Sequence, residues 1–319
     1  MNVLITCAGR RASLLRSFQV AAHPLGLRVL AADCDPLAPA CLLADRAFPV
    51  PKVDDPAYLA ALLAIARAQE VDLIVPTNDH ELPGLADHED LFREAGIRLA
   101  LSTTGFVGLC MDKWELGERL RAEGIQVPVS WLPGQTVPPL PERLFVKPRD
   151  GSASLDSYPC RLEDLEPLLT LVPRPLIQEF LEGPEITVDA LMDWEGRLVH
   201  YVPRERIRTL AGESIQSVTL DRPDLDPWIE RTLAVCSRLG ARGPLNIQAF
   251  LTRSGPVLTE INPRFGGGFP LTRAAGGDYP AWLLALARGE AVPSHLGQYR
   301  RGLYMTRFYV ELFLESPSW

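Results

Sequence analysis

The stretch from Pro256 to Phe269 carries residue types suited to metal and phosphate chemistry. Its apolar residues predict a strand that runs into Glu260, Asn262 and Arg264. Because alternate residues of a strand point to the same side, these three side chains share one face. Carboxylate and amide oxygens suit Mg²⁺, and a guanidinium offers a planar set of donors to a phosphoryl group. The stretch therefore predicts an enzyme that uses ATP.

The residues just before this strand predict its partner. Residues 245–251 and 256–262 both have strand character and are separated by a short segment that ends in glycine. A three-residue loop, 253–255, with its glycine in the left-handed position, is common in such hairpins and sets Thr252 opposite Pro256.

This register brings four polar side chains together. Counting back from the loop sets Gln248 opposite Glu260 and Asn246 opposite Asn262. Directly opposed residues share a face, so the four form a polar square in an otherwise apolar hairpin. The alternative is a hairpin whose polar face lies in water. We favour the metal site because an arginine follows the four amide and carboxylate groups, which makes Gln248, Glu260 and Asn262 candidate ligands.

Lysine is rare in this chain, and two of its positions lie in motifs. Only three of the 32 basic residues are lysine. Lys113 lies in the first turn of a helix predicted over 111–120, where a cation is mildly unfavourable for the helix dipole. Lys147 ends a short predicted strand that opens into a loop of small residues, including Ser152 and Ser154. Such a loop lets backbone amides approach phosphate oxygens and predicts a lid over a nucleotide.

Residues 176–190 predict a strand, a bend at Gly183 and Pro184, and a second strand. The segment Gln178-Glu179-Phe180-Leu181 has backbone groups for an adenine edge and side chains to wall the ring, and Glu185 can accept from ribose hydroxyls. The alternative is a plain hairpin.

Three arginines follow at strand spacing, at 204, 206 and 208. They would repel one another unless anions lie nearby, so a substrate carboxylate or a triphosphate is a reasonable target. A solvated strand is about equally favoured. We select Arg206 as a candidate catalytic residue.

Residues 1–105 alternate predicted strands and helices, which indicates a parallel sheet with helices on both faces. The turn after the first strand, 7–11, has one glycine and lacks the GxGxxG pattern of a dinucleotide site. Polar residues gather at the carboxyl edge of this sheet, where such sheets bind ligands. They are Arg10, Arg11, Asp33, Asp35, Asp79 and Glu81. The alternative for Asp79 and Glu81 is that they only begin the next helix.

Composition excludes several classes of function. The net charge of -8 and pI near 5.3 argue against a nucleic-acid-binding surface. No run is long and apolar enough to span a membrane, and the N-terminus is strand-like, so we expect a cytoplasmic protein. The six cysteines show no zinc-site spacing. Helices near 227–239 and 280–288 have no evident chemistry, and 302–314 predicts a closing pair of strands.

Taken in order, the motifs resemble the ATP-grasp superfamily, in particular its carbamoyl-phosphate-synthase-like branch of carboxylate-amine ligases. The motifs are Val75-Pro-Thr-Asn-Asp-His-Glu-Leu82, Met111-Asp-Lys113, Val146-Lys-Pro-Arg149, Gln178-Glu-Phe-Leu-Glu-Gly-Pro-Glu185, Asn246-Ile-Gln248 and Glu260-Ile-Asn-Pro-Arg264. The resemblance implies an α/β ATP-grasp fold (α+β in the ATP-binding lobes) with a Rossmann-like domain at 1–105 and an ATP-grasp domain at 106–319. The latter would comprise a lid lobe at about 124–181 and a large lobe at about 182–319.

The resemblance also implies roles for individual residues. Lys113 and Lys147 would contact ATP phosphates, Gln178 to Leu181 would form the adenine hinge, and Glu185 would hold the ribose. Gln248, Glu260 and Asn262 would hold magnesium, and Arg264 would steady the transferred group.

The reaction implied is phosphorylation of a carboxylate to an acyl phosphate, which an amine then attacks. The partners would be a small carboxylic acid and an amine, amino acids among them, and a homodimer is left open. Two alternatives remain. One is a regulatory nucleotide-binding protein that has lost the chemistry, and the other is an enzyme that forms carbamoyl phosphate or carboxyphosphate.

Overall fold

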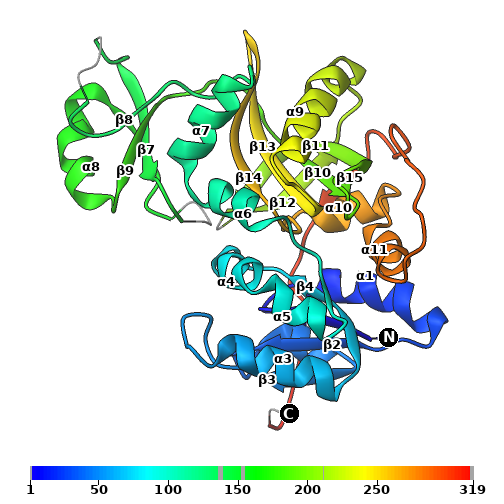
Figure 1. Cartoon of the computed structure of the whole chain (residues 1–319). Helices are drawn as coiled ribbons and strands as arrows, with labels where there is room; N and C mark the ends of the chain where they lie inside the picture. Colours follow the sequence, from blue (N-terminus) through cyan, green and yellow to red (C-terminus); the bar gives the residue numbers. More distant parts are fainter. Residues whose placement is uncertain (1, 136–138, 152–154, 211, 317–319) are drawn as a thin grey trace.

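The computed structural model describes residues 2–135, 139–151, 155–210 and 212–316, and these residues form three β-sheets (Figure 1). A parallel sheet lies in the N-terminal part, and two antiparallel sheets follow it along the chain. The architecture is the predicted α/β arrangement with α+β lobes. Within the described ranges, no helix is long and apolar enough to cross a membrane.

The N-terminal sheet has five parallel strands in the order β3-β2-β1-β4-β5. Their bounds are β1 (Asn2–Thr6), β2 (Val29–Asp33), β3 (Arg46–Pro49), β4 (Val71–Pro76) and β5 (Arg98–Leu99). The three strands predicted from apolar runs are confirmed as β1, β2 and β4. The sequence prediction did not include β3 and β5, which are short and flank the sheet.

Helices cover both faces of this sheet because both faces are apolar. Val3 and Ile5 of β1 lie in one core cluster with Phe18, and the intervening Leu4 lies in another with Leu62. This alternation follows from the two-residue period of a strand. The helices are α1 (Ala12–Ala22), α2 (Pro39–Leu43), α3 (Tyr58–Ala68), α4 (Leu82–Asp87), α5 (Glu89–Glu94) and α6 (Thr104–Met111). The last helix, α11 (Tyr279–Ala287), also packs against α1.

The four-stranded sheet forms a small lobe, in green at the upper left of Figure 1. Its order is β6-β9-β7-β8, with all neighbours antiparallel. The bounds are β6 (Ser130–Trp131), β7 (Arg143–Pro148), β8 (Tyr158–Arg161), β9 (Pro175–Glu179) and α8 (Leu165–Leu171). The strand predicted to end at Lys147 is β7, which carries Lys147 one residue before its end.

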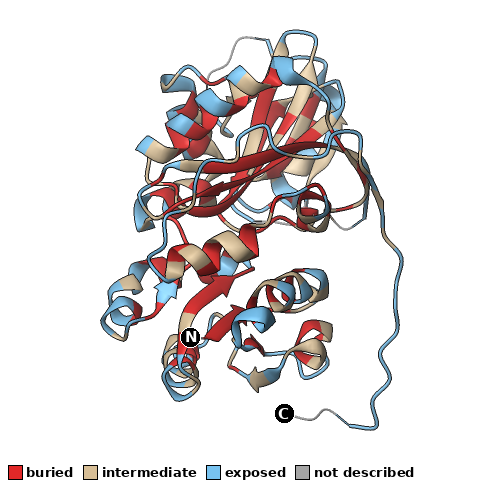
Figure 2. Ribbon diagram, turned by 90° about the vertical axis from the view of Figure 1, so that its right-hand side faces the viewer, coloured by how far each residue is buried: buried red, intermediate tan, exposed pale blue. Residues whose placement is uncertain are grey.

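The six-stranded sheet is the centre of the molecule, and its order is β14-β13-β10-β11-β12-β15. Its strands are β10 (Glu185–Met192), β11 (Leu198–Leu210), β12 (Glu213–Thr219), β13 (Gly243–Thr252), β14 (Gly255–Asn262) and β15 (Tyr304–Thr306). The associated helices are α7 (Lys113–Ala122), α9 (Asp226–Arg238) and α10 (Phe269–Ala274). Figure 2 shows the buried residues concentrated along these strands.

The hairpin of β13 and β14 has the predicted pairing but a different loop. Thr252 pairs with Gly255, so the loop has two residues and not three. Three pairs further along the hairpin, a bulge shifts the register between Gln248 and Ala249 and leaves Thr259 as the extra residue. The bulge compensates for the shorter loop, so Gln248 pairs with Glu260 as predicted.

One alternative and one expectation about strand pairing are wrong. Strands β9 and β10 are not a hairpin, because β9 belongs to the small lobe and β10 to the central sheet. Gly183 lies between them with a φ of 137°, and a Cβ there would be 2.1 Å from the Leu251 carbonyl oxygen. In the tail, β15 pairs with β12, but residues 307–316, which are the rest of the described tail, form no second strand. Phe308 and Phe313 in this segment are 84% and 91% exposed. Figure 2 shows the segment extended along the outside of the molecule.

Candidate active site

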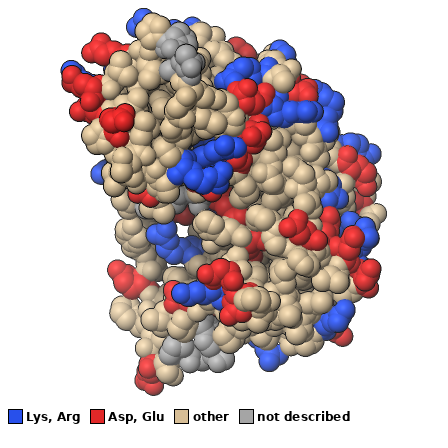
Figure 3. Space-filling view, turned by 60° about the vertical axis from the view of Figure 1, so that its left-hand side comes forward, with Lys and Arg blue, Asp and Glu red and all other residues tan. Residues whose placement is uncertain are grey.

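Two cavities adjoin in the centre of the molecule. The larger, of about 540 Å³, lies between the four-stranded lobe and the central sheet, and the smaller, of about 310 Å³, lies between the central sheet and the carboxyl edge of the parallel sheet. Four residues line both, namely Arg206, Gly212, Gln248 and Glu260. Figure 3 shows the surface hollowed in this region, with basic side chains at its rim. Their shared wall places the two cavities in contact.

The larger cavity has an apolar part formed by the predicted adenine segment. Gln178, Glu179, Phe180 and Leu181 all line it. Gln178 is buried and its amide donates to the Ser130 hydroxyl at 2.9 Å, which fixes its orientation. Gln178 and Glu179 end strand β9, which lies between β6 and β7, and Phe180 and Leu181 follow it. The structure thus brings the predicted segment to a cavity wall.

Both lysines selected from the sequence line the same cavity. Lys147 is only 7% exposed, and its ammonium has no hydrogen bond or ion pair with another of the described residues. Burial lowers the pKa of Lys147 from its ordinary 10.5 to about 8, while the nearby Glu260 raises it. A buried cation without a partner favours an anionic ligand.

Lys113 is held at the start of α7 and donates from Nζ to the Gly151 carbonyl at 2.6 Å. Asp112 caps this helix through the backbone N–H groups of residues 114 and 115. Gly151 belongs to the predicted lid loop, so Lys113 contacts the loop itself. The predicted contacts Ser152 and Ser154 lie outside the described residues.

Glu185 and Arg206 form an ion pair at the junction of the cavities. Arg206 also donates to Gln248 Oε1 at 3.2 Å and to the Gly212 carbonyl at 2.6 Å. Burial raises the pKa of Glu185, and the Arg206 guanidinium opposes this rise. The anion beside Arg206 of β11 is therefore a carboxylate of the protein itself, that of Glu185. Arg208 is exposed, and a register shift separates it from Arg206.

The predicted metal ligands lie together at the shared wall. Gln248 and Glu260 are paired across the hairpin and line both cavities, and Asn262 lines the smaller one. The Glu260 carboxylate has no hydrogen bond or ion pair with any described residue. Asn262 Oδ1 accepts from Arg264 at 3.2 Å. An unpartnered carboxylate between two amide oxygens is a donor set that fits Mg²⁺.

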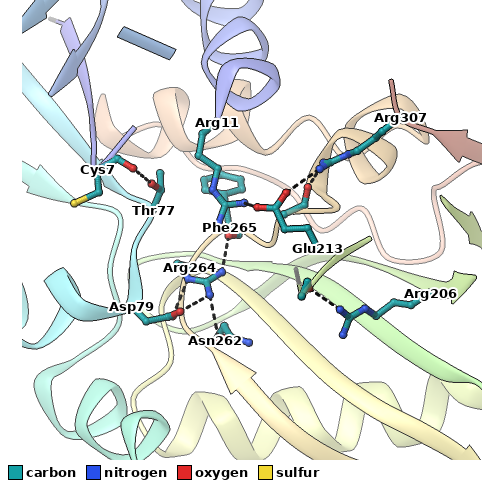
Figure 4. Close-up of polar contacts among 12 residues, drawn as sticks. Cys7, Arg11, Thr77, Asp79, Arg206, Glu213, Asn262, Arg264, Phe265 and Arg307 are labelled. Carbon is teal, nitrogen blue, oxygen red and sulfur yellow. Dashed lines mark hydrogen bonds and ion pairs between the residues drawn. The ribbon is translucent and has the colours of Figure 1, made fainter. Parts of the chain in front are cut away.

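Arg264 is bound by a residue of the N-terminal sheet. Its Nε donates to Asp79 Oδ1 at 2.7 Å, and its Nη2 donates to the other oxygen of the same carboxylate (Figure 4). The side chains are 12% and 10% exposed. The sequence offered substrate binding or a helix start for Asp79, and the structure places it in a short helix, η2 (Asp79–Glu81), on the wall of the smaller cavity.

Glu81 is turned into the core and is not available to a substrate. Its carboxylate accepts from the Tyr58 hydroxyl at 2.7 Å and from the backbone N–H groups of Thr77 and Asn78. Burial raises its pKa, and these hydrogen bonds oppose the rise. The alternative in which Glu81 only serves the start of a helix is therefore the better description.

A buried network behind the smaller cavity was missed by the sequence analysis. Asp189 lies in β10 and accepts hydrogen bonds from Arg204, Asn246 and Thr272. A charged residue inside the otherwise apolar run of β10 was the available signal, because a buried carboxylate requires partners. Arg204 and Asn246 are thereby committed to the protein interior.

The glycine run 266–268 packs directly on these side chains. A Cβ at Gly266 would be 2.2 Å from the Asn246 amide nitrogen, and a Cβ at Gly268 would be 2.3 Å from Cζ of Arg204. A Cβ at Gly267 would lie 3.1 Å from Glu213 and 3.2 Å from Arg11. The run therefore lets the backbone approach the cavity wall closely.

The sheets and lobes described above form the predicted ATP-grasp fold, and family models match two parts of the chain. The family model described as the PylC-like N-terminal domain matches residues 3–100, and the model described as ATP-grasp in the biosynthetic pathway with Ter operon matches residues 172–308. The second match covers less than half of the chain and agrees with the predicted resemblance to the ATP-grasp superfamily.

One relative and several solved structures are similar. The large chain of carbamoyl phosphate synthase from Thermomicrobium roseum is 33% identical over 107 residues, which span 32% of this chain and only 10% of that protein. The biotin carboxylase domain of 2-oxoglutarate carboxylase from Hydrogenobacter thermophilus, in complex with MgADP, ADP and bicarbonate, has a TM-score of 0.75 at 16% identity and covers 95% of this chain and 73% of its own.

Two further structures share the fold. The L-amino acid ligase from Bacillus licheniformis has a TM-score of 0.70 at 19% identity, covering 90% of this chain and 73% of its own. N5-carboxyaminoimidazole synthetase from Staphylococcus aureus, complexed with ADP, has a TM-score of 0.74 at 15% identity, covering 92% of this chain and 78% of its own.

Proposed function

We propose that this protein is an ATP-dependent ligase that activates a carboxylate as an acyl phosphate and joins it to an amine, with release of ADP and phosphate. The observation that carries the proposal is the meeting of two cavities at Gln248 and Glu260. A nucleotide in the larger cavity would thus present its terminal phosphate to an acid in the smaller one. We propose a Rossmann-like domain at 1–105 and an ATP-grasp domain at 106–319 as the units that meet there.

We assign the larger cavity to ATP. Its volume lies within the range of small-molecule sites, and it is apolar at one end and cationic at the other. Gln178 to Leu181 would hold the adenine, and Lys113 and Lys147 would bind phosphates. Glu185 would accept from the ribose hydroxyls with its orientation fixed by Arg206.

Magnesium would be held by Glu260, Gln248 and Asn262. The fit rests on the unpartnered Glu260 carboxylate beside the two amide oxygens. A magnesium ion held by these three residues would supply positive charge that offsets the charge of the phosphates. Arg206 and Arg264 orient the two amides through the hydrogen bonds to Gln248 and Asn262.

The two steps need no protein nucleophile. A carboxylate oxygen of the acid attacks the terminal phosphorus of ATP, and the bond from that phosphorus to ADP breaks. The amine then attacks the acyl carbon, phosphate leaves, and the amine loses a proton. Lys147, Arg206 and Arg264 would oppose the negative charge of the transferred group.

Magnesium-dependent ADP release over a panel of carboxylates and amines tests this proposal. Lys147→Ala should lose most turnover, because removal of one transition-state donor costs about 2.7–4 kcal/mol, or roughly two to three orders of magnitude in rate. The exposed Lys52 provides the matched control, since Lys52→Ala removes a lysine that lines neither cavity. Unchanged ADP release in Lys147→Ala would contradict the assignment.

The same panel separates the other candidates. ADP release that depends on bicarbonate and not on an organic acid would indicate a carboxyphosphate-forming enzyme. Nucleotide binding without ADP release over the whole panel would indicate a regulatory protein.

A further inference from the structure

The smaller cavity is lined by more cations than the transfer of one phosphoryl group requires. Five arginines line it, at 10, 11, 204, 206 and 264, against three carboxylates, at 79, 213 and 260. Two of the arginines, Arg10 and Arg11, come from the turn between β1 and α1, on the side of the cavity formed by the N-terminal sheet.

Three of the five arginines are neutralised by carboxylates of the protein. Arg204 pairs with Asp189 at 3.0 Å, Arg206 pairs with Glu185, and Arg264 pairs with Asp79. Each of these side chains is mostly buried. Their donors are thus largely committed within the protein.

Arg10 and Arg11 are less well paired. Arg10 makes no hydrogen bond or ion pair with another described residue. Among the described residues, Arg11 forms one long ion pair, with Glu213 at 3.7 Å, and Glu213 also accepts a hydrogen bond from Arg307 at 3.1 Å. Figure 4 shows Arg11 reaching from the start of α1 toward Glu213, with Arg264 beyond it.

The positive charge at Arg11 is poorly compensated. Burial and the neighbouring Arg264 together lower the pKa of Arg11 to about 10, although Glu213 and Asp79 oppose the change. An arginine in this setting favours an anion close to its donors, and its planar fork suits carboxylate and phosphate oxygens equally.

We propose that Arg10 and Arg11 bind a second anionic group of the acid substrate, at the end remote from Glu260. This inference rests on the proposed function, which places the reacting carboxylate at the wall shared with the ATP cavity. The acid then carries two anionic groups, the reacting carboxylate and a carboxylate or phosphate at its far end, and we call an acid with two such groups a dianion whatever its total charge. The second anionic group sets which acids are accepted.

Calorimetric titration of the full chain, saturated with MgADP, tests the proposal without turnover. The probes are dicarboxylates of three to six carbons, monocarboxylates of matched carbon number, and phosphonocarboxylates of matched length. The tightest ligand should be a dianion, at least about tenfold tighter than its monoanionic match. Whether dicarboxylates or phosphonocarboxylates of the same length bind more tightly shows if the second anionic group is a carboxylate or a phosphate.

The variants are Arg10→Gln and Arg11→Gln, with Arg16→Gln as the control. Arg16 is exposed on helix α1, which begins directly after Arg11; it does not line the cavity and has no described partner. Each cavity variant should weaken dianion binding by about tenfold to a hundredfold, the effect of one hydrogen bond to a charged group, and leave monoanions within about twofold. Should Arg11→Gln fold poorly, the exposed Arg10→Gln decides the result.

The outcomes separate this inference from the proposed function. Equal binding of monoanions and dianions, no binding of any dianion, or cavity variants that match Arg16→Gln would each overturn the second anion site. Dianion binding that depends on Arg10 and Arg11, with no ADP release by any acid, would retain the anion site and contradict the ligase. ADP release with monocarboxylates as the best substrates would support the ligase and contradict the second anion site.

Discussion

Both carboxylate oxygens of Asp79 accept hydrogen bonds from the guanidinium of Arg264, and this contact joins two positions 185 residues apart. Asp79 follows β4 of the parallel sheet, and Arg264 follows β14 of the central sheet. The same guanidinium donates to Asn262, a proposed metal ligand. The N-terminal sheet therefore determines where one side of the proposed transfer site lies.

We expect Asp79→Asn to lower kcat with a smaller effect on the KM for ATP, because Arg264 would lose its fixed position while the nucleotide cavity stays intact. The free energy of unfolding should fall by about 2 kcal/mol, the range for a hydrogen bond to a charged group. Steady-state kinetics and urea unfolding measure the two effects. The exposed Asp87 supplies the control substitution Asp87→Asn, and equal kcat in both variants would count against a positioning role.

The local parts of this site could be predicted from the sequence. Glu260, Asn262 and Gln248 lie on one hairpin, and strand periodicity together with a short loop is enough to bring them together. The loop length was wrong, and the bulge at Thr259 restored the pairing. The bulge has no distinct pattern in the sequence, so the correct register rested on two compensating errors.

Contacts between distant segments could not be predicted in the same way. The ion pair of Asp79 and Arg264 depends on how two sheets pack, and no period within either strand encodes that packing. The network around Asp189 is intermediate, because a carboxylate inside an apolar strand signals a need for partners without naming them. The polar edge of the parallel sheet was predicted as one group of residues. Asp79 and Glu81 are only two positions apart, yet Asp79 faces the smaller cavity and Glu81 faces the core.

Glu260→Gln tests the metal site. The substitution keeps the shape of the side chain but removes the unpartnered charge at the wall of both cavities. We expect the magnesium concentration for half-maximal ADP release to rise at least about tenfold, since even indirect contacts to a metal account for such a factor. Calorimetry of ADP binding with and without magnesium provides a readout independent of turnover. Glu94→Gln is the control, because Glu94 is exposed. If Glu260→Gln has the same magnesium dependence as this control and the parent, Glu260 is not a magnesium ligand.

Lys147 should lower the free energy of unfolding of the protein. Its pKa is about 8 in the folded protein against an ordinary 10.5, so between these values the unfolded chain binds more protons and stability rises with pH. Below pH 8 the full penalty is present. Lys147→Met should therefore raise the free energy of unfolding at pH 7 by on the order of 3 kcal/mol while turnover is lost.

Urea unfolding at pH 7 and pH 9.5 checks this expectation. The advantage of Lys147→Met over the parent should shrink at the higher pH, because the parent's lysine is then largely neutral in the folded protein. An advantage that is the same at both values would show that the gain comes from packing alone. Lys52→Met is the control, as Lys52 is exposed.

Gly267→Ala tests whether the glycine run shapes the acid cavity. The added Cβ would meet Glu213 at 3.1 Å and Arg11 at 3.2 Å, so both side chains must move by a few tenths of an ångström. We expect the KM for the acid to rise several-fold with the KM for ATP unchanged, because neither neighbour lines the ATP cavity.

Gly117→Ala is the matched control for Gly267→Ala. Nothing lies within 4 Å of its Cβ in α7, and alanine there should stabilise the helix by up to about 1 kcal/mol without a kinetic effect. Equal acid KM values in the two variants would indicate that Arg11 and Glu213 do not contact the acid.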